Sequence, residues 1–253
     1  MYKHHEESIE KMIGHYRENP EVKALFLVGS VATGTERANS DLDCVAVVSN
    51  EHYEALKKTG GDHESVFGKS TYSDGGYFDN HFMSKEHLEH LAKAGTEPWR
   101  NMFTDAKVLF SDDSNLEKIV AQIPVYPESE RAEKQLRFYC TFNFLYTYYL
   151  KICKPEGFMK DYVANGMVYN LYRLILLENN LLFPSLRKLE MAIEKAPNKP
   201  EGIMEKCQRF MDSMSVEDGL DLLDSYKAWT SYDYPPESEF QFIANNYFNP
   251  LEY

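Results

Sequence analysis

Two aspartates separated by one residue, Asp41 and Asp43, are candidate ligands of a metal ion. They open an apolar, β-branched run at 43–49 that is typical of a buried strand. Because side chains alternate along a strand, residues two apart point to the same face, so both carboxylates should lie together. Carboxylates at close range repel each other unless a cation neutralises them, and oxygen ligands suit Mg²⁺. The spacing therefore predicts a magnesium site.

A glycine–serine pair, Gly29-Ser30, stands shortly before these aspartates. Glycine lets a backbone approach a phosphate closely, and free N–H groups at a turn, helped by a serine hydroxyl, can hold a triphosphate. An Asp-x-Asp pair alone arises about once by chance in a chain of this size. The Gly-Ser pair and the Asp-x-Asp pair become informative in combination, because each adjoins a predicted apolar strand.

Around these residues, over 1–120, the sequence predicts alternating helices and strands. Apolar residues at helical spacing predict a first helix over 3–18, which Asn19-Pro20 ends. A buried strand should end at Gly29-Ser30, and residues 59–76 should form a loop with an edge strand. The pattern predicts further strands over 43–49 and 77–83, and helices over 51–58 and 84–95, the last capped by Ser84.

The segment around Pro124 and Pro127 indicates a domain boundary, and the pattern beyond it is helical. Phe138, Phe142, Leu145, Tyr149 and Ile152 recur at 4-3-4-3 spacing, which predicts one apolar helix face. Further helices are expected over 161–178, 185–195, 201–213 and 216–230. We therefore predict an α+β fold: a catalytic domain over 1–123 with a small mixed sheet and flanking helices, and an all-helical, substrate-binding bundle over 124–253. The active site is expected in the cleft between them.

Residues 27–48 resemble the DNA polymerase β-type nucleotidyltransferase superfamily, in its branch of small-molecule enzymes such as aminoglycoside and lincosamide nucleotidyltransferases. The motif of that family is matched by Gly29, Ser30, Ala32, Gly34, Ser40, Asp41 and Asp43. The resemblance implies that Gly29, Ser30 and Ser40 bind the nucleotide. It also implies a third metal-binding carboxylate on a later strand, for which Asp79 is the best match and Asp74 the rival. Asp79 would bind a second metal or act as general base.

The helical half resembles the domain attached to many bacterial members of this superfamily. A basic residue usually follows a Phe/Tyr-Pro pair there, so the resemblance implies that Arg187 or Lys188 contacts the triphosphate. Some relatives place a catalytic glutamate in this domain, which makes Glu178 an alternative general base to Asp79. An exposed acid at the end of a helix is the simpler interpretation of Glu178.

Composition limits the partners. With 27 basic and 40 acidic residues the net charge is −13, which disfavours nucleic acid and suits a cationic acceptor. Four widely spaced cysteines indicate reduced, mostly buried thiols, and no apolar run approaches the ~18 residues of a membrane span. We expect a cytoplasmic protein and leave open its oligomeric state, a homodimer included.

Together these features predict transfer of a nucleoside monophosphate from a nucleoside triphosphate, with ATP as the expected donor, to a hydroxyl of a small molecule such as an antibiotic. One or two Mg²⁺ ions would be bound by Asp41, Asp43 and Asp79. Two alternatives stay open: an enzyme that modifies protein side chains, and a nucleotide-binding regulator or toxin–antitoxin partner without turnover.

Overall fold

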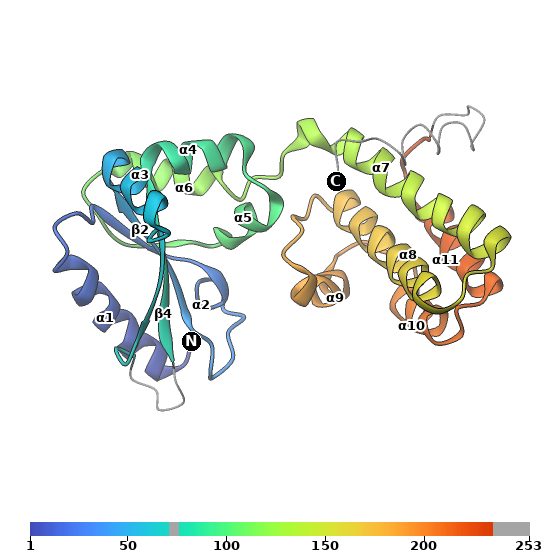
Figure 1. Ribbon diagram of the computed structural model, residues 1–253, viewed down its shortest axis with the longest axis horizontal. Coiled ribbons are helices and arrows are strands. Elements are labelled where there is room, and N and C mark those ends of the chain that lie inside the picture. The colour runs from blue at the N-terminus through green and yellow to red at the C-terminus, as the bar shows by residue number, and fades with distance from the viewer. Residues whose placement is uncertain (71–75, 235–253) are drawn as a thin grey trace. The chain divides into compact units, whose positions relative to one another are not determined.

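A computed structural model describes residues 1–70 and 76–234 of the chain (Figure 1). The chain divides into two compact units, Met1–Val125 and Tyr126–Tyr253. The first holds a sheet with helices and the second holds helices, so the predicted α+β class is confirmed. Within the described residues, no helix is both long and apolar enough to cross a bilayer.

The first unit is built on a five-stranded mixed sheet in the order β3-β4-β2-β1-β5. Strand β1 pairs antiparallel with β2 and β5, β3 pairs antiparallel with β4, and β2 and β4 are parallel. The strands are β1 (Ala24–Leu27), β2 (Leu42–Val48), β3 (His63–Phe67), β4 (Tyr77–Ser84) and β5 (Lys107–Ser111). The helices are α1 (Lys3–Arg17), α2 (Gly29–Thr33), α3 (Asn50–Thr59), α4 (Lys85–Ala94), α5 (Glu97–Met102) and α6 (Ser114–Gln122).

Strand β1 shows why both faces of this sheet are covered. Leu25 and Leu27 pack into a core with α1, whereas Ala24 and Phe26 pack into a second core with α4 and α6. Alternate side chains of the strand therefore pack into two different apolar cores, which explains the unbroken apolar run in the sequence. Figure 1 shows α4 and α6 side by side on their face of the sheet, with α1 on the other.

Two local differences separate the first unit from the sequence-based expectation. Strand β1 ends at Leu27 rather than Ser30, because Gly29 already begins the short helix α2. Elements α5, β5 and α6 were not predicted individually; β5 is a partly exposed edge strand whose apolar run, 108–110, is short. Ser84 caps α4 as expected, accepting a hydrogen bond from the backbone N–H of His87 at 3.1 Å.

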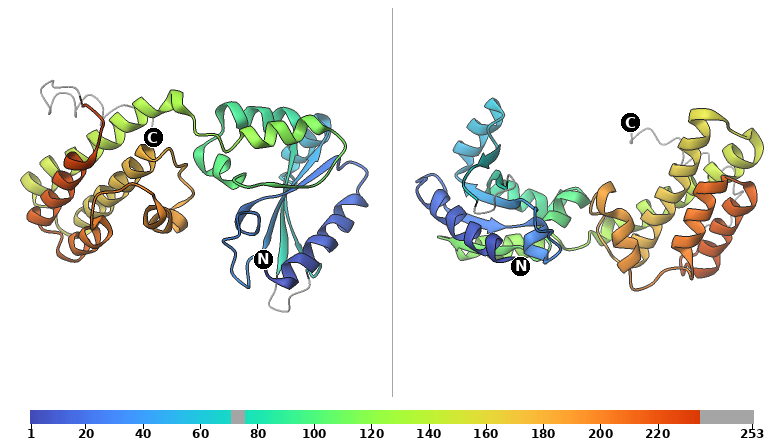
Figure 2. Two further views of the ribbon diagram at one scale, coloured as in Figure 1. Left: turned by 180° about the vertical axis from the view of Figure 1, so that it is seen from behind. Right: turned by 90° about the horizontal axis from the view of Figure 1, so that it is seen from below.

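The second unit is helical, as Figure 2 shows in green through red. It contains η1 (Glu128–Glu130), α7 (Arg131–Phe144), the π-helix η2 (Leu145–Cys153), α8 (Gly157–Glu178), α9 (Leu186–Lys195), α10 (Ile203–Ser213) and α11 (Val216–Trp229). The expected apolar stripe is buried at Phe142 and Leu145, but Ile152 is 67% exposed. A π-helix bonds residue i to i+5, so η2 rotates the later side chains away from the face that α-helical spacing predicts.

The cysteines follow the expectation with one exception. Cys44, Cys140 and Cys207 are buried free thiols, whereas Cys153, at the end of η2, is exposed. Burial raises the pKa of the Cys140 and Cys207 thiols to about 12, so both stay protonated and unreactive at neutral pH.

Candidate metal and nucleotide site

Three carboxylates meet where the parallel strands β2 and β4 lie side by side. Asp43 on β2 is the direct register partner of Asp79 on β4, and Asp41 comes one residue before β2. Each of the three offers an oxygen, and these oxygens all lie within 4.8 Å of one another. All three residues are half-buried, so their mutual repulsion is only partly screened by water. Such a group attracts a hard divalent cation.

Gly29 lies directly against the carboxylate of Asp43. The backbone N–H of Val28 donates to the Asp43 carbonyl at 3.0 Å, which fixes the two segments to each other. Gly29 has a φ of 69°, and a Cβ placed on it would stand 2.0 Å from Asp43 Oδ2. Two constraints therefore favour glycine at residue 29: the left-handed backbone conformation, and the Asp43 side chain, which fills the space that a Cβ would need. Ser30 follows in α2, half-buried.

The loop that precedes Asp41 is hydrogen-bonded to α1. The buried His5 donates from Nε2 to the carbonyl of Ser40 at 3.0 Å, and His4 Nε2 donates to the carbonyl of Ala38 at 2.8 Å. Ser40 closes a tight turn, in which its Oγ accepts from the Arg37 N–H at 2.9 Å. Burial lowers the pKa of His5, so its imidazole is neutral at pH 7. Ser40 thus has a clear structural task, and its predicted contact with the nucleotide stays a prediction.

Tyr77, the first residue of β4, joins the carboxylates from the same strand face as Asp79. A hydrogen bond to Asp41, then burial, then the negative charges of Asp41, Asp79 and Asp43 raise the pKa of Tyr77 to about 12. The phenol is therefore neutral and donates to the acidic group. Sequence reasoning missed Tyr77, although its position two residues before Asp79 on a predicted strand was a usable signal.

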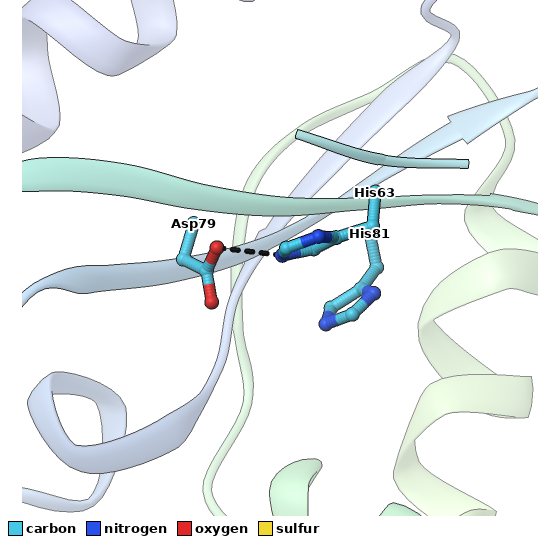
Figure 3. Close-up of side chains that lie close together, drawn as sticks. All are labelled: His63, Asp79 and His81. Atoms are coloured by element: carbon cyan, nitrogen blue, oxygen red, sulfur yellow. Dashed lines mark hydrogen bonds and ion pairs between the residues drawn. The ribbon is translucent and has the colours of Figure 1, made fainter. Parts of the chain in front are cut away.

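Asp79 is held by the neighbouring edge strand. Its Oδ1 accepts hydrogen bonds from His63 Nε2 at 2.7 Å and from Ser65 Oγ at 3.1 Å. Figure 3 shows His63 and His81 beside Asp79. The centroids of the two imidazole rings are 4.7 Å apart. Burial, and then the charge that His63 could carry, lower the pKa of His81. His63 falls in a stretch expected to be a loop with an edge strand, and nothing in the sequence alone marked it.

The remaining predicted site residues lie in the second unit or outside the described residues. Arg187 is exposed and Lys188 half-buried at the start of α9, and their contact with a triphosphate stays a prediction. Glu178 is half-buried at the end of α8, where its carboxylate accepts hydrogen bonds from Gln135, Thr230 and Ser231. Asp74, the rival of Asp79, lies outside the described residues.

A comparison with known protein families finds a match, which lies in the first unit. Residues 9–93 match a family model described as a nucleotidyltransferase domain, a range that includes Gly29, Ser30 and all three aspartates. No curated protein matches the sequence.

Three solved structures are similar to the chain at low identity. A nucleotidyltransferase-like protein from Exiguobacterium sibiricum is 10% identical, with a TM-score of 0.43 over 88% of this chain and 74% of that one. A spectinomycin adenyltransferase from Enterococcus faecialis, solved with ATP and spectinomycin, is 16% identical, with a TM-score of 0.37 over 95% and 97%. A toxin–antitoxin structure with AMP-PNP is 21% identical, with a TM-score of 0.29 over 50% and 92%. The similarity to the nucleotidyltransferase family therefore rests on the match over residues 9–93.

Proposed function

We propose that this chain is a nucleotidyltransferase of the DNA polymerase β type, with its nucleotidyltransferase domain at residues 9–93, and that it catalyses the following reaction. The protein moves a nucleoside monophosphate from a nucleoside triphosphate, with ATP as the expected donor, to a hydroxyl of a small molecule, and releases pyrophosphate. One observation carries the proposal: oxygens of Asp41, Asp43 and Asp79 lie within 4.8 Å of one another beside the Gly29-Ser30 segment.

The donor set at this place fits Mg²⁺. Opposite ligands on an octahedral ion with bonds of ~2.1 Å lie ~4.2 Å apart, so oxygens within this spacing need only small movements to bind it. When bound, one or two Mg²⁺ ions would neutralise the charge that develops on the triphosphate. Asp41, Asp43 and Asp79 are the proposed ligands, and Tyr77 orients Asp41 through its hydrogen bond.

Gly29 and Ser30 are the proposed phosphate contacts. Backbone N–H groups and the Ser30 hydroxyl would donate to phosphate oxygens. Because Gly29 has no side chain and lies against Asp43, phosphates bound here would lie next to the metal ligands. Ser40 is a further proposed contact through the loop that it closes.

In the proposed reaction, the acceptor oxygen forms a bond to the α-phosphorus while the bond from that phosphorus to the bridging oxygen of pyrophosphate breaks. The acceptor proton passes to a general base, a role that we propose for Asp79 where Asp41 and Asp43 alone bind the Mg²⁺ ion, as the alternative to binding a second ion. The hydrogen bonds from His63 and Ser65 to one oxygen of Asp79 hold its carboxylate in place. Glu178 is the weaker alternative, because its carboxylate already joins α7 and the end of α11 to α8. Most of the rate enhancement would come from positioning and charge neutralisation.

A small acceptor is favoured over nucleic acid by the charge of the chain. A net charge of −13 repels a polymer of phosphates and attracts a cationic molecule such as an aminoglycoside. A protein hydroxyl as acceptor, or nucleotide binding without turnover, are the alternatives that an experiment must separate.

Pyrophosphate release separates these functions. The purified chain is incubated with Mg²⁺ and each of the four common nucleoside triphosphates, across a panel of hydroxylated acceptors that includes aminoglycosides and lincosamides. The expected result is release with one acceptor class, a product heavier by one nucleoside monophosphate, and loss of release in Asp41→Asn. A nucleoside monophosphate attached to protein in place of the small molecules would favour the protein-modifying alternative. Nucleotide binding without release for any acceptor would favour the non-catalytic one.

A further inference from the structure

Beside the three carboxylates lies a different group of potential ligands, His63, Asp79 and His81. We propose that these residues form a second cation site, which binds a borderline divalent transition metal such as Zn²⁺ and shares Asp79 with the proposed Mg²⁺ site. Binding at this site does not depend on the proposed reaction, whereas its effect on turnover rests on that proposed function.

Strand pairing brings the three ligands together on one face of the sheet. His63 on β3 is the register partner of His81 on β4, and Asp79 is two residues before His81 on the same strand. Directly opposite residues in an antiparallel pair, and residues two apart on one strand, all point the same way. One ligand atom of each residue lies within 4.8 Å of the other two, and His63 Nε2 is 2.7 Å from Asp79 Oδ1. Figure 3 shows the three side chains converging.

The chemistry of this group differs from that of the three aspartates. Two imidazole nitrogens and one carboxylate favour zinc, cobalt, nickel or copper, whereas Mg²⁺ prefers oxygen ligands. In a tetrahedral zinc site with bonds of ~2.0–2.1 Å, ligand atoms stand ~3.3 Å apart. The observed spacing brackets that value, so small rotations of the side chains suffice. Three protein ligands would leave a fourth position for water or a phosphate oxygen.

The surroundings provide both order and access. His81 is half-buried, and its ring meets the ring of Trp99 edge-to-face at 5.1 Å, which restricts its rotation. The side chain of His63 is 48% exposed at the edge strand, which gives an ion a path from solvent. Asp79 belongs to both groups. An ion at the histidine site would therefore neutralise part of the negative charge that binds Mg²⁺. We therefore expect occupancy to raise the Mg²⁺ concentration needed for half-maximal turnover.

Metal titration of the whole chain tests the site directly. Co²⁺, added in the presence of excess Mg²⁺, reports nitrogen ligation through its visible absorption, and Zn²⁺ binding is measured by calorimetry. We expect one tight ion per chain, with affinity at least about tenfold weaker in His63→Ala and in His81→Asn. His90→Ala is the matched control, because it removes an exposed imidazole of the His87/His90 pair on α4. Circular dichroism confirms that the variants are folded.

Asp41→Asn separates this inference from the proposed function. That variant should lose nucleotidyl transfer yet bind Co²⁺ like the wild type, because it keeps His63, Asp79 and His81. A wild-type chain that binds neither Co²⁺ nor Zn²⁺ under excess Mg²⁺ would overturn the site. Equal affinity in the wild type and in His63→Ala would overturn it as well.

Discussion

Replacement of Gly29 by alanine tests how the strand–helix junction and the acidic group depend on each other. A Cβ at residue 29 would lie 2.0 Å from Asp43 Oδ2, 2.6 Å from its Cγ and 2.9 Å from its Cβ. Rotation of the Asp43 side chain does not move the Cβ of Asp43, so it cannot relieve the contact between that atom and the new Cβ at residue 29. The backbone must therefore also move. Gly29→Ala therefore perturbs Asp43 while it leaves every ligand chemically intact.

The size of the effect follows from two contributions. A φ of 69° at Gly29 costs a non-glycine residue roughly 1–2 kcal/mol. Forcing an extra methyl into a filled space adds about 1–3 kcal/mol, so we expect a total loss of about 2–5 kcal/mol in the free energy of unfolding. Ordinary contact begins at 3.4 Å, so Oδ2 must retreat by roughly 1.4 Å. A displacement of ~1 Å at a metal ligand should lower kcat/KM about 10²-fold.

Gly60→Ala is the matched control. Gly60 has a φ of 70°, and a Cβ there would meet nothing within 4 Å, so the variant isolates the backbone contribution. Urea unfolding followed by circular dichroism gives the stability of both variants, and pyrophosphate release gives kcat/KM. We expect Gly60→Ala to lose about 1–2 kcal/mol with unchanged turnover. If Gly29→Ala lost no more stability and no more activity than this control, the Asp43 side chain would not require a glycine at residue 29.

Three further predictions concern stability. Asn80→Ala should lose about 1–3 kcal/mol in urea unfolding, because the buried Asn80 Oδ1 accepts a hydrogen bond from the Ala46 N–H at 3.0 Å that alanine cannot accept. The pKa of His5 is lower in the folded chain than its ordinary 6.5, so the unfolded chain binds the proton first; stability is full above pH 6.5 and should fall below it. Unfolding at a series of pH values should show a slope of at most about 1.4 kcal/mol per pH unit from this group, shallower in His5→Gln. Arg173→Lys should lose about 1–2 kcal/mol, because the guanidinium lies 4.5 Å from the Phe138 ring and 4.4 Å from the Phe183 ring and lysine cannot stack there; an unchanged urea midpoint would contradict this.

The sequence was sufficient for the elements with a strong local signal. The runs that became β1 and β2 are unbroken and apolar because each strand is covered on both faces, and a run of that kind needs no partner to be recognised. The start of α4 could be predicted from Ser84, because an N-cap is a hydrogen bond between residues close in sequence. Asp41 and Asp43 could be paired from strand alternation alone.

Features that depend on pairing between distant segments could not be predicted. The register between Asp43 and Asp79 is set by a parallel pairing of β2 and β4. His63 reaches Asp79 only because β3 pairs with β4 in one register, and a shift of one residue would turn it to the other face. Ile152 is exposed because η2 departs from α-helical hydrogen bonding, which the spacing of apolar residues does not reveal.

The central claim is that Asp41, Asp43 and Asp79 together support nucleotidyl transfer. Its most direct test is the rate of transfer of an α-labelled nucleotide, at saturating Mg²⁺, to the acceptor that gives pyrophosphate release in the proposed panel, in the wild type and in Asp43→Asn. Asparagine keeps the size of the side chain and removes the charge, so circular dichroism and the urea midpoint should change little. We expect Asp43→Asn to lose turnover by at least about 10²–10³-fold, as for other groups that stabilise transition-state charge. A folded Asp43→Asn variant that turns over at the wild-type rate would contradict it.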